Sequence, residues 1–219
     1  MRTFRILSAL LCYPEAEMLG ALDDMRVVLR SEALLPDDRR HGIEHFMTSL
    51  SETDLLDAQE NYVGLFDRNR SLSLHLYEHV HGDSRERGEA MVRLVTLYRL
   101  HGLDVAANEL PDYLPLYLEF LSQLPSRAAC SFLAEAAHVI AALAEKLEAR
   151  RSAYAAVLRA VEALAAKQPQ PFAVAETLQK LAPDADSLVE LDRQWEDEAV
   201  RFTAAGGPQE TAMAPACGR

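Results

Sequence analysis

Residues 62–124 of the chain read YVGLFDRNRSLSLHLYEHVHGDSRERGEAMVRLVTLYRLHGLDVAANELPDYLPLYLEFLSQL. Ser84 suits the N-cap of a helix that runs to His101, and Gly102 suits its C-cap. Pro111 suits the first turn of a following helix, which ends before Pro125. The stretch therefore predicts two helices, each with one buried face. The apolar residues that recur at the helical period are Met91, Leu94, Val95 and Tyr98 in the first helix, and Leu114, Tyr117, Leu118 and Leu121 in the second.

The remainder of the chain continues the helical pattern. Only 9 of the 219 residues are glycine, and the many Ala, Leu, Glu and Arg residues favour helix over sheet. Ser71–Leu76 alternates polar and apolar residues as a strand does, but no second strand pattern lies nearby to pair with it. We expect a packed loop there that leads into a short helix. Further helices are predicted over residues 4–11, 15–30, 39–50, 127–151, 152–167 and 174–181, and over Leu55–Phe66 after a capping box that begins at Ser51.

The domain organisation follows from the length and from a change of composition near residue 184. A chain of 219 residues favours one domain with a full hydrophobic core. Residues 184–198 carry seven acidic residues against one arginine, and no periodicity remains beyond Phe202. We therefore predict an all-α fold with a single helical bundle domain over residues 1–183. Residues 184–219 are expected to form a short acidic appendage with a partly disordered tail.

Charge and cysteine content narrow the function classes. The formal net charge of −12 argues against nucleic-acid binding, because phosphates would be repelled. Cys12, Cys130 and Cys217 are odd in number and widely separated, so they form no disulfide framework and favour a reducing compartment. The apolar run near the N-terminus ends in Tyr13-Pro14-Glu15 without a cleavage site, and no run is long enough to span a bilayer. We expect a cytoplasmic protein that does not insert into the membrane.

Histidines, carboxylates and arginines crowd into residues 75–87, and two ligand classes could use them. His75, His79 and His81 with Glu78 and Asp83 supply enough donors for a metal, which would allow a metal-dependent hydrolase. Alternatively, residues 82–88 offer a helix N-terminus with Arg85 and Arg87 to an anion, which would suit a nucleotide-responsive regulator. In the structural alternative these histidines bond backbone carbonyls and the arginines are solvated. Adjacent Ser84, His81 and Asp83 make a poor catalytic triad, because triad members converge from separate positions.

A second polar cluster, Glu109-Leu110-Pro111-Asp112-Tyr113, precedes a helix that carries Tyr117. Carboxylates beside amphipathic aromatic side chains suit a hydrophobic peptide that carries Arg or Lys. In the structural alternative Asp112 complements the helix dipole and the tyrosines fill core edges. These residues favour a binding protein over an enzyme.

Three segments resemble a known family. They are residues 61–68 (NYVGLFDR), residues 73–88 (SLHLYEHVHGDSRERG) and residues 109–115 (ELPDYLP), with looser likeness at residues 7–14 and 191–198. Together they resemble the NarJ-type assembly chaperones of respiratory nitrate reductase, which belong to the broader TorD-like group. The likeness covers residues 1 to about 200 and is densest from 60 to 125.

The resemblance implies an all-helical TorD-like chaperone without catalytic activity, resident metal or cofactor of its own. It implies that the partner is the apo catalytic (alpha) subunit of membrane-bound nitrate reductase, held through its N-terminal peptide. Membrane docking would wait until molybdenum cofactor and an iron–sulfur cluster are inserted, and contact with the insertion machinery is left open. On this basis the expected client-peptide residues are Tyr62, Glu78, Glu109, Asp112, Tyr113 and Tyr117, and the expected supporting loop comprises His75, His79, His81, Asp83, Arg85 and Arg87.

Overall fold

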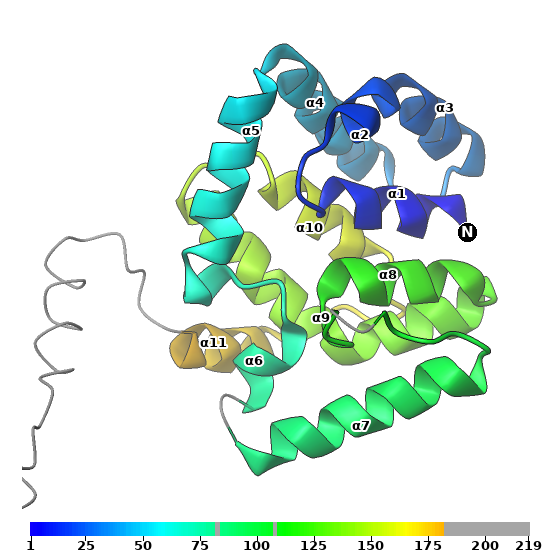
Figure 1. Ribbon diagram of the computed structural model, residues 1–219, viewed down its shortest axis with the longest axis vertical. Coiled ribbons are helices and arrows are strands. Elements are labelled where there is room, and N and C mark those ends of the chain that lie inside the picture. Colours follow the sequence, from blue (N-terminus) through cyan, green and yellow to red (C-terminus); the bar gives the residue numbers. More distant parts are fainter. Residues whose placement is uncertain (82–83, 107–108, 182–219) are drawn as a thin grey trace, which may run out of the picture. The chain divides into compact units, whose positions relative to one another are not determined.

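The computed structural model describes residues 1–81, 84–106 and 109–181, and in these ranges its regular elements are helices joined by loops, without a β-sheet (Figure 1). This confirms the predicted all-α class. The chain divides into two units, Met1–Pro183 and Asp184–Arg219. The predicted acidic appendage and disordered tail lie outside the described residues.

The first helices differ from the predicted ones in two places. The single helix predicted over residues 15–30 is divided into two at Ala21. The predicted cap at Ser51 is wrong: Ser51 lies inside a helix, and Asp54 instead caps the next one, its carboxylate accepting a hydrogen bond from the Leu56 N–H at 2.9 Å. The elements are α1 (Arg2–Leu10), α2 (Ala16–Gly20), α3 (Leu22–Glu32), α4 (Asp37–Glu52), α5 (Leu55–Tyr62) and a π-helical turn over Val63–Asp67.

The later helices follow the sequence expectation more closely. Gly102 follows the end of α7 (Arg85–Leu100) with a positive φ of 78°, and its N–H donates to the Arg99 carbonyl, as a helix C-cap requires. The prediction for Pro111 is wrong, because the next helix begins at Leu114 and takes Pro115 into its first turn. The elements are a 3₁₀ turn (Arg70–Leu72), α6 (Leu76–His81), α7 (Arg85–Leu100), α8 (Leu114–Gln123), α9 (Ser126–Ala149), α10 (Ala155–Ala163) and α11 (Pro171–Lys180).

The long helix α9 is central to the core. It packs against α10, α11, α6 and α8, while α8 also contacts α1, and α10 contacts α4 (Figure 1). Leu133, Ile140 and Leu147 recur along α9 at a seven-residue spacing and are all fully buried. The expectation that no run is long enough to span a bilayer is wrong by length and composition: within the described ranges α9 is the one helix long and apolar enough, and half of its apolar window is buried inside the fold. Its apolar composition is thus accounted for by its place in the core.

Helix α1 is capped by a carboxylate from a distant segment. The Glu32 side chain at the end of α3 accepts hydrogen bonds from the N–H groups of Arg2 and Thr3 at 2.9 and 2.8 Å. It also accepts one from the Thr3 hydroxyl at 2.8 Å, and Thr3 is buried. The first N–H groups of a helix have no acceptor within the helix, and Met1 at the N-cap offers no side-chain acceptor. Glu32 therefore supplies the acceptor that the residues around the start of α1 lack.

Replacing Glu32 with glutamine is expected to destabilise the protein by about 1 kcal/mol at neutral pH, as loss of a helix cap does. Burial raises the pKa of Glu32, but the three hydrogen bonds outweigh it and hold this pKa below its ordinary value. The ionised Glu32 side chain therefore contributes fully to the free energy of unfolding above the ordinary glutamate pKa of about 4.3. This contribution is lost as the pH falls through the lower pKa that Glu32 has in the folded protein. Urea unfolding at pH 7 and at acidic pH tests this. The difference between wild type and Glu32→Gln should shrink in acid, whereas the exposed Glu17→Gln should change neither curve.

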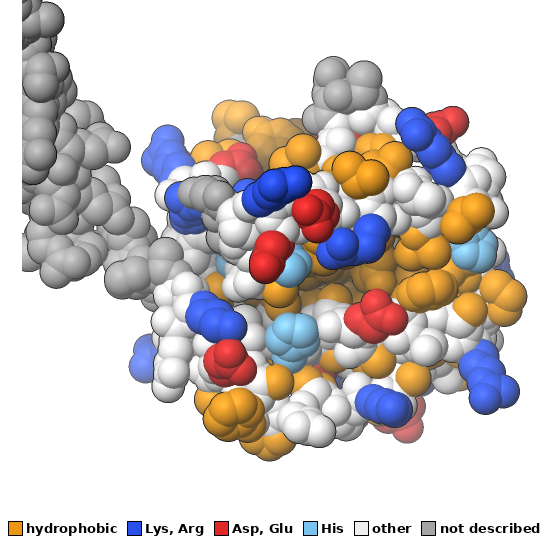
Figure 2. Space-filling model, turned by 90° about the horizontal axis from the view of Figure 1, so that it is seen from below, with side chains coloured by type: hydrophobic (Ala, Val, Ile, Leu, Met, Phe, Trp, Pro, Cys, Tyr) orange, Lys and Arg blue, Asp and Glu red, His pale blue; other side chains and the backbone are white. Residues whose placement is uncertain are grey.

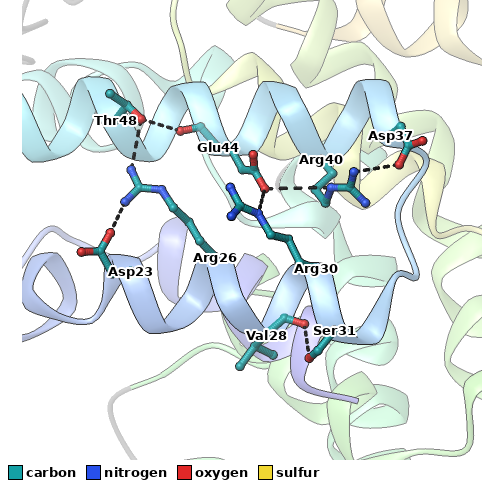
Figure 3. A network of polar contacts seen from close by, with 9 residues as sticks. All are labelled: Asp23, Arg26, Val28, Arg30, Ser31, Asp37, Arg40, Glu44 and Thr48. Carbon is teal, nitrogen blue, oxygen red and sulfur yellow. Dashed lines mark hydrogen bonds and ion pairs between the residues drawn. The ribbon is translucent and has the colours of Figure 1, made fainter.

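An ion pair and a hydrogen bond connect α3 to α4, made by side chains that lie between the two helices (Figure 3). Arg30 donates to Glu44 at 2.7 Å, and Arg26 donates to the Thr48 hydroxyl at 3.1 Å. Arg40 pairs with Asp37 at 2.8 Å within α4. Ion pairs in which one partner is solvent-exposed contribute about 0–1 kcal/mol each, so this network orients the two helices more than it stabilises them.

Candidate functional site

Asp112 is the centre of the polar region that the sequence singled out. Its side chain is fully buried, with 0% exposure, although the polar motif Glu109–Tyr113 suggested a surface position. One carboxylate oxygen accepts the backbone N–H of Tyr77 at 3.0 Å, and the other lies 3.3 Å from Nδ1 of His75. Arg87 brings a guanidinium nitrogen to 4.0 Å. A buried carboxylate requires such partners, and Asp112 thereby connects three segments of the chain.

The backbone around Asp112 strengthens the same connection. The Leu76 N–H donates to the Asp112 carbonyl at 3.0 Å, and the Leu114 N–H donates to the Leu74 carbonyl at 2.8 Å. These bonds form an isolated antiparallel bridge between His75 and Tyr113. Since Leu76 and Tyr77 begin α6, Asp112 caps α6 with both its main chain and its side chain. The loop predicted over Ser71–Leu76 is confirmed, with this bridge as its one strand-like feature among the described residues.

Tyr62 and Tyr113 form a second connection, toward α1. The buried Tyr62 hydroxyl donates to the Leu11 carbonyl at 2.9 Å and lies 3.1 Å from the Tyr113 hydroxyl. Burial raises the pKa of Tyr113 to about 12, and raises that of Tyr62 further, with Tyr113 adding to the effect. Both phenols are therefore neutral hydrogen-bonding groups at physiological pH. The Tyr113 ring also packs against His75, with ring centroids 5.3 Å apart.

The three histidines of the predicted loop have separate partners. His75 faces Asp112, and the buried His79 donates from Nε2 to the Ser73 carbonyl at 2.6 Å. His81 lies against the Tyr77 ring and 3.9 Å from Glu86. No group of three His, Cys, Asp or Glu side chains converges anywhere in the described parts of the chain. The metal-dependent hydrolase alternative therefore has no support.

The remaining predicted residues are dispersed around this centre. Glu78 pairs with Arg70 at 2.7 Å, and Glu109 is exposed. Arg85 is 94% exposed and lies 3.6 Å from Glu89, whereas Arg87 approaches Asp112. The anion site of the nucleotide alternative includes Gly82 and Asp83, which lie outside the described residues.

A groove opens beside this centre, between α7 and α9, with α6 and α8 as its inner walls. It has a volume of about 220 Å³. Seen from the α7 side, apolar side chains cover the floor of a hollow, and charged side chains and histidines stand around it (Figure 2). A smaller hollow of about 140 Å³ shares Val80 and His138 and extends toward α11. The groove is lined by Leu76, Tyr77, Val80, Leu94, Tyr117, Glu135, Ala136, His138 and Val139.

Of the predicted client residues, Tyr117 lines this groove. Its hydroxyl donates to the Phe132 carbonyl at 3.0 Å, so the ring is fixed against α9. Sequence reasoning missed Tyr77, Glu135 and His138. One signal could have found the last two: they are polar residues one helical turn apart within an Ala- and Leu-rich helix that otherwise serves the core.

The fold and the site together define a class: an all-helical protein with a small, largely apolar groove of about 220 Å³. The chain belongs to the nitrate reductase delta subunit family, whose model matches residues 32–160.

Relatives of known description share most of the chain. It is 41% identical over 208 residues to the nitrate reductase molybdenum cofactor assembly chaperone NarJ of Escherichia coli K12, covering 95% of this chain and 88% of that protein. It is 36% identical to the probable assembly chaperone NarW of the same organism, covering 92% of this chain and 84% of that protein. A probable nitrate reductase molybdenum cofactor assembly chaperone NarJ of Bacillus subtilis 168 is 31% identical, covering 71% of this chain and 84% of that protein.

Proposed function

We propose that this protein is an assembly chaperone for nitrate reductase that acts while the molybdenum cofactor is loaded. The observation that carries the proposal is the 41% identity to the Escherichia coli chaperone over 95% of this chain and 88% of that protein. Because the likeness runs over nearly the whole length of both proteins, it includes every helix that forms the groove.

The partner in this proposal is the apo catalytic (alpha) subunit, bound through its N-terminal peptide in the cytoplasm. The groove supports this choice, since its apolar floor suits an amphipathic peptide helix or an extended apolar segment. The overall charge of −12 favours a client segment with positive charge. The protein itself performs no chemistry on the client in this proposal.

Five of the six predicted client residues divide into three roles. Tyr117 contacts the peptide directly from the groove wall. Asp112 is buried and acts through the segment it holds, because its hydrogen bonds place Tyr77 on the groove. Tyr113 and Glu109 form a rim of the binding surface on the α1 side. Tyr62 supports this rim through the contact between its hydroxyl and that of Tyr113.

Isothermal titration calorimetry with the full chain and a synthetic N-terminal peptide of the nitrate reductase alpha subunit tests the proposal. We expect saturable one-to-one binding with a negative heat-capacity change, the mark of buried apolar surface. A scrambled peptide of the same composition is the control. Absence of heat at high micromolar peptide, or equal binding of the scrambled peptide, would contradict the proposed function.

A further inference from the structure

One carboxylate at the mouth of the groove has no ionic partner among the described residues. Glu135 is exposed, lines the groove and takes part in none of the ion pairs between described side chains. Other glutamates of the bundle, such as Glu44, Glu148 and Glu162, are paired with arginines. Glu135 thus differs from the glutamates that serve the fold.

Two tyrosines lie under this carboxylate. Burial and then Glu135 raise the pKa of Tyr117, and burial, Asp112 and Glu135 raise that of Tyr77. The Glu135 carboxylate is therefore electrostatically close to both phenols. Tyr77 is half-buried in the groove wall, whereas Tyr117 is buried with 6% of its surface exposed. Aromatic rings next to a carboxylate favour a cation whose aliphatic stem can lie on apolar surface.

The other titratable groups around the groove do not reverse this preference for a cationic ligand. Burial and then Lys180 lower the pKa of His138, so its ring is neutral at physiological pH. That ring also hydrogen-bonds the backbone of Glu135, one turn earlier on α9. Arg93 on α7 lies close enough to Tyr77 to lower its pKa. Among the described groups that influence the pKa of Tyr77, Arg93 is the one cation, and it would repel a positively charged ligand there.

We propose that Glu135 and the rings of Tyr77 and Tyr117 form a subsite that takes one lysine or arginine side chain of the client peptide. The aliphatic stem of that side chain lies along the half-buried Tyr77 ring, beside the small exposed part of Tyr117, and its charged end pairs with Glu135. The neighbouring apolar floor at Leu94, Ala136 and Val139 takes the apolar residues that flank the cation. This subsite rests on the proposed function, and it names the feature of the client that the groove selects.

Calorimetry with Glu135→Gln and peptide variants tests the subsite. Glu135→Gln is expected to weaken binding of the alpha-subunit peptide about tenfold, as loss of one charge-assisted contact does. Peptides in which one Lys or Arg at a time is replaced by glutamine identify the partner. For one position the loss should be large with wild type and absent with Glu135→Gln, because the two substitutions remove the same interaction.

Two matched variants control for net charge. Glu145→Gln removes a negative charge from an exposed position further along α9 and should leave the affinity unchanged. Arg93→Gln removes the opposing cation and should raise the affinity slightly. Binding that is equally strong in Glu135→Gln, or additive losses at every peptide position, would overturn the subsite while the proposed function stands. Failure of the wild-type protein to bind the peptide would overturn both.

Discussion

Replacing Asp112 with alanine is expected to lower the free energy of unfolding by about 3 kcal/mol, because it removes a fully buried carboxylate and leaves the Tyr77 N–H without its acceptor. The Tyr77 N–H, the His75 ring and the Arg87 guanidinium all face this carboxylate. No other acceptor in the described structure replaces it at the first turn of α6. The change should also weaken peptide binding, since Tyr77 and Val80 on α6 line the groove.

Urea unfolding followed by far-ultraviolet circular dichroism measures this effect. Glu109→Ala is a matched control from the same motif, and at its exposed position it should alter stability by less than about 0.5 kcal/mol. Asp112→Asn keeps one acceptor oxygen for the Tyr77 N–H and should fall between the two. An Asp112→Ala protein as stable as wild type would show that the carboxylate does not hold α6 in place.

Replacing Ala136 with tryptophan is expected to reduce affinity for the alpha-subunit peptide by at least about a hundredfold, since an indole of this size fills the floor of a groove of about 220 Å³. Ala136 is half-buried and lines the groove between Glu135 and His138. The substituted side chain extends into open space and not into the core, so the free energy of unfolding should change by less than about 1 kcal/mol.

Thr96→Trp provides the control for this substitution. Thr96 is exposed on α7 and is not among the groove-lining residues. The same bulk added there should leave peptide affinity unchanged. If Ala136→Trp bound the peptide as wild type does, with its stability intact, the client would have to bind elsewhere on the protein.

Much of the fold could be predicted from the sequence because its helices follow local signals. The period of Leu and Ala along α9, the glycine after α7 and the stop at Pro125 are properties of short windows of chain. The family could also be predicted, because its motifs are contiguous runs of residues. One error arose at a helix start, where Ser51 was expected to cap the helix that Asp54 caps.

The candidate site was harder to predict, because its residues act across long separations. Asp112 looked like a surface residue at a helix start, but it is buried and serves α6. Only packing shows that Tyr77 on α6, Tyr117 on α8 and Glu135 on α9 share one groove. The motif Glu109–Tyr113 was therefore located by its sequence, while its carboxylates proved to have different surroundings: one exposed and one enclosed.

The capping of α1 by Glu32 and of α6 by Asp112 has a consequence for synthesis of the protein. Each helix depends on an acceptor that leaves the ribosome after it does, so neither can be completed when its own residues emerge. The groove needs Val139 as well, which comes later still. A nascent chain can therefore present no finished groove until most of the bundle has been made, and a truncated product ending before α9 would lack the groove altogether.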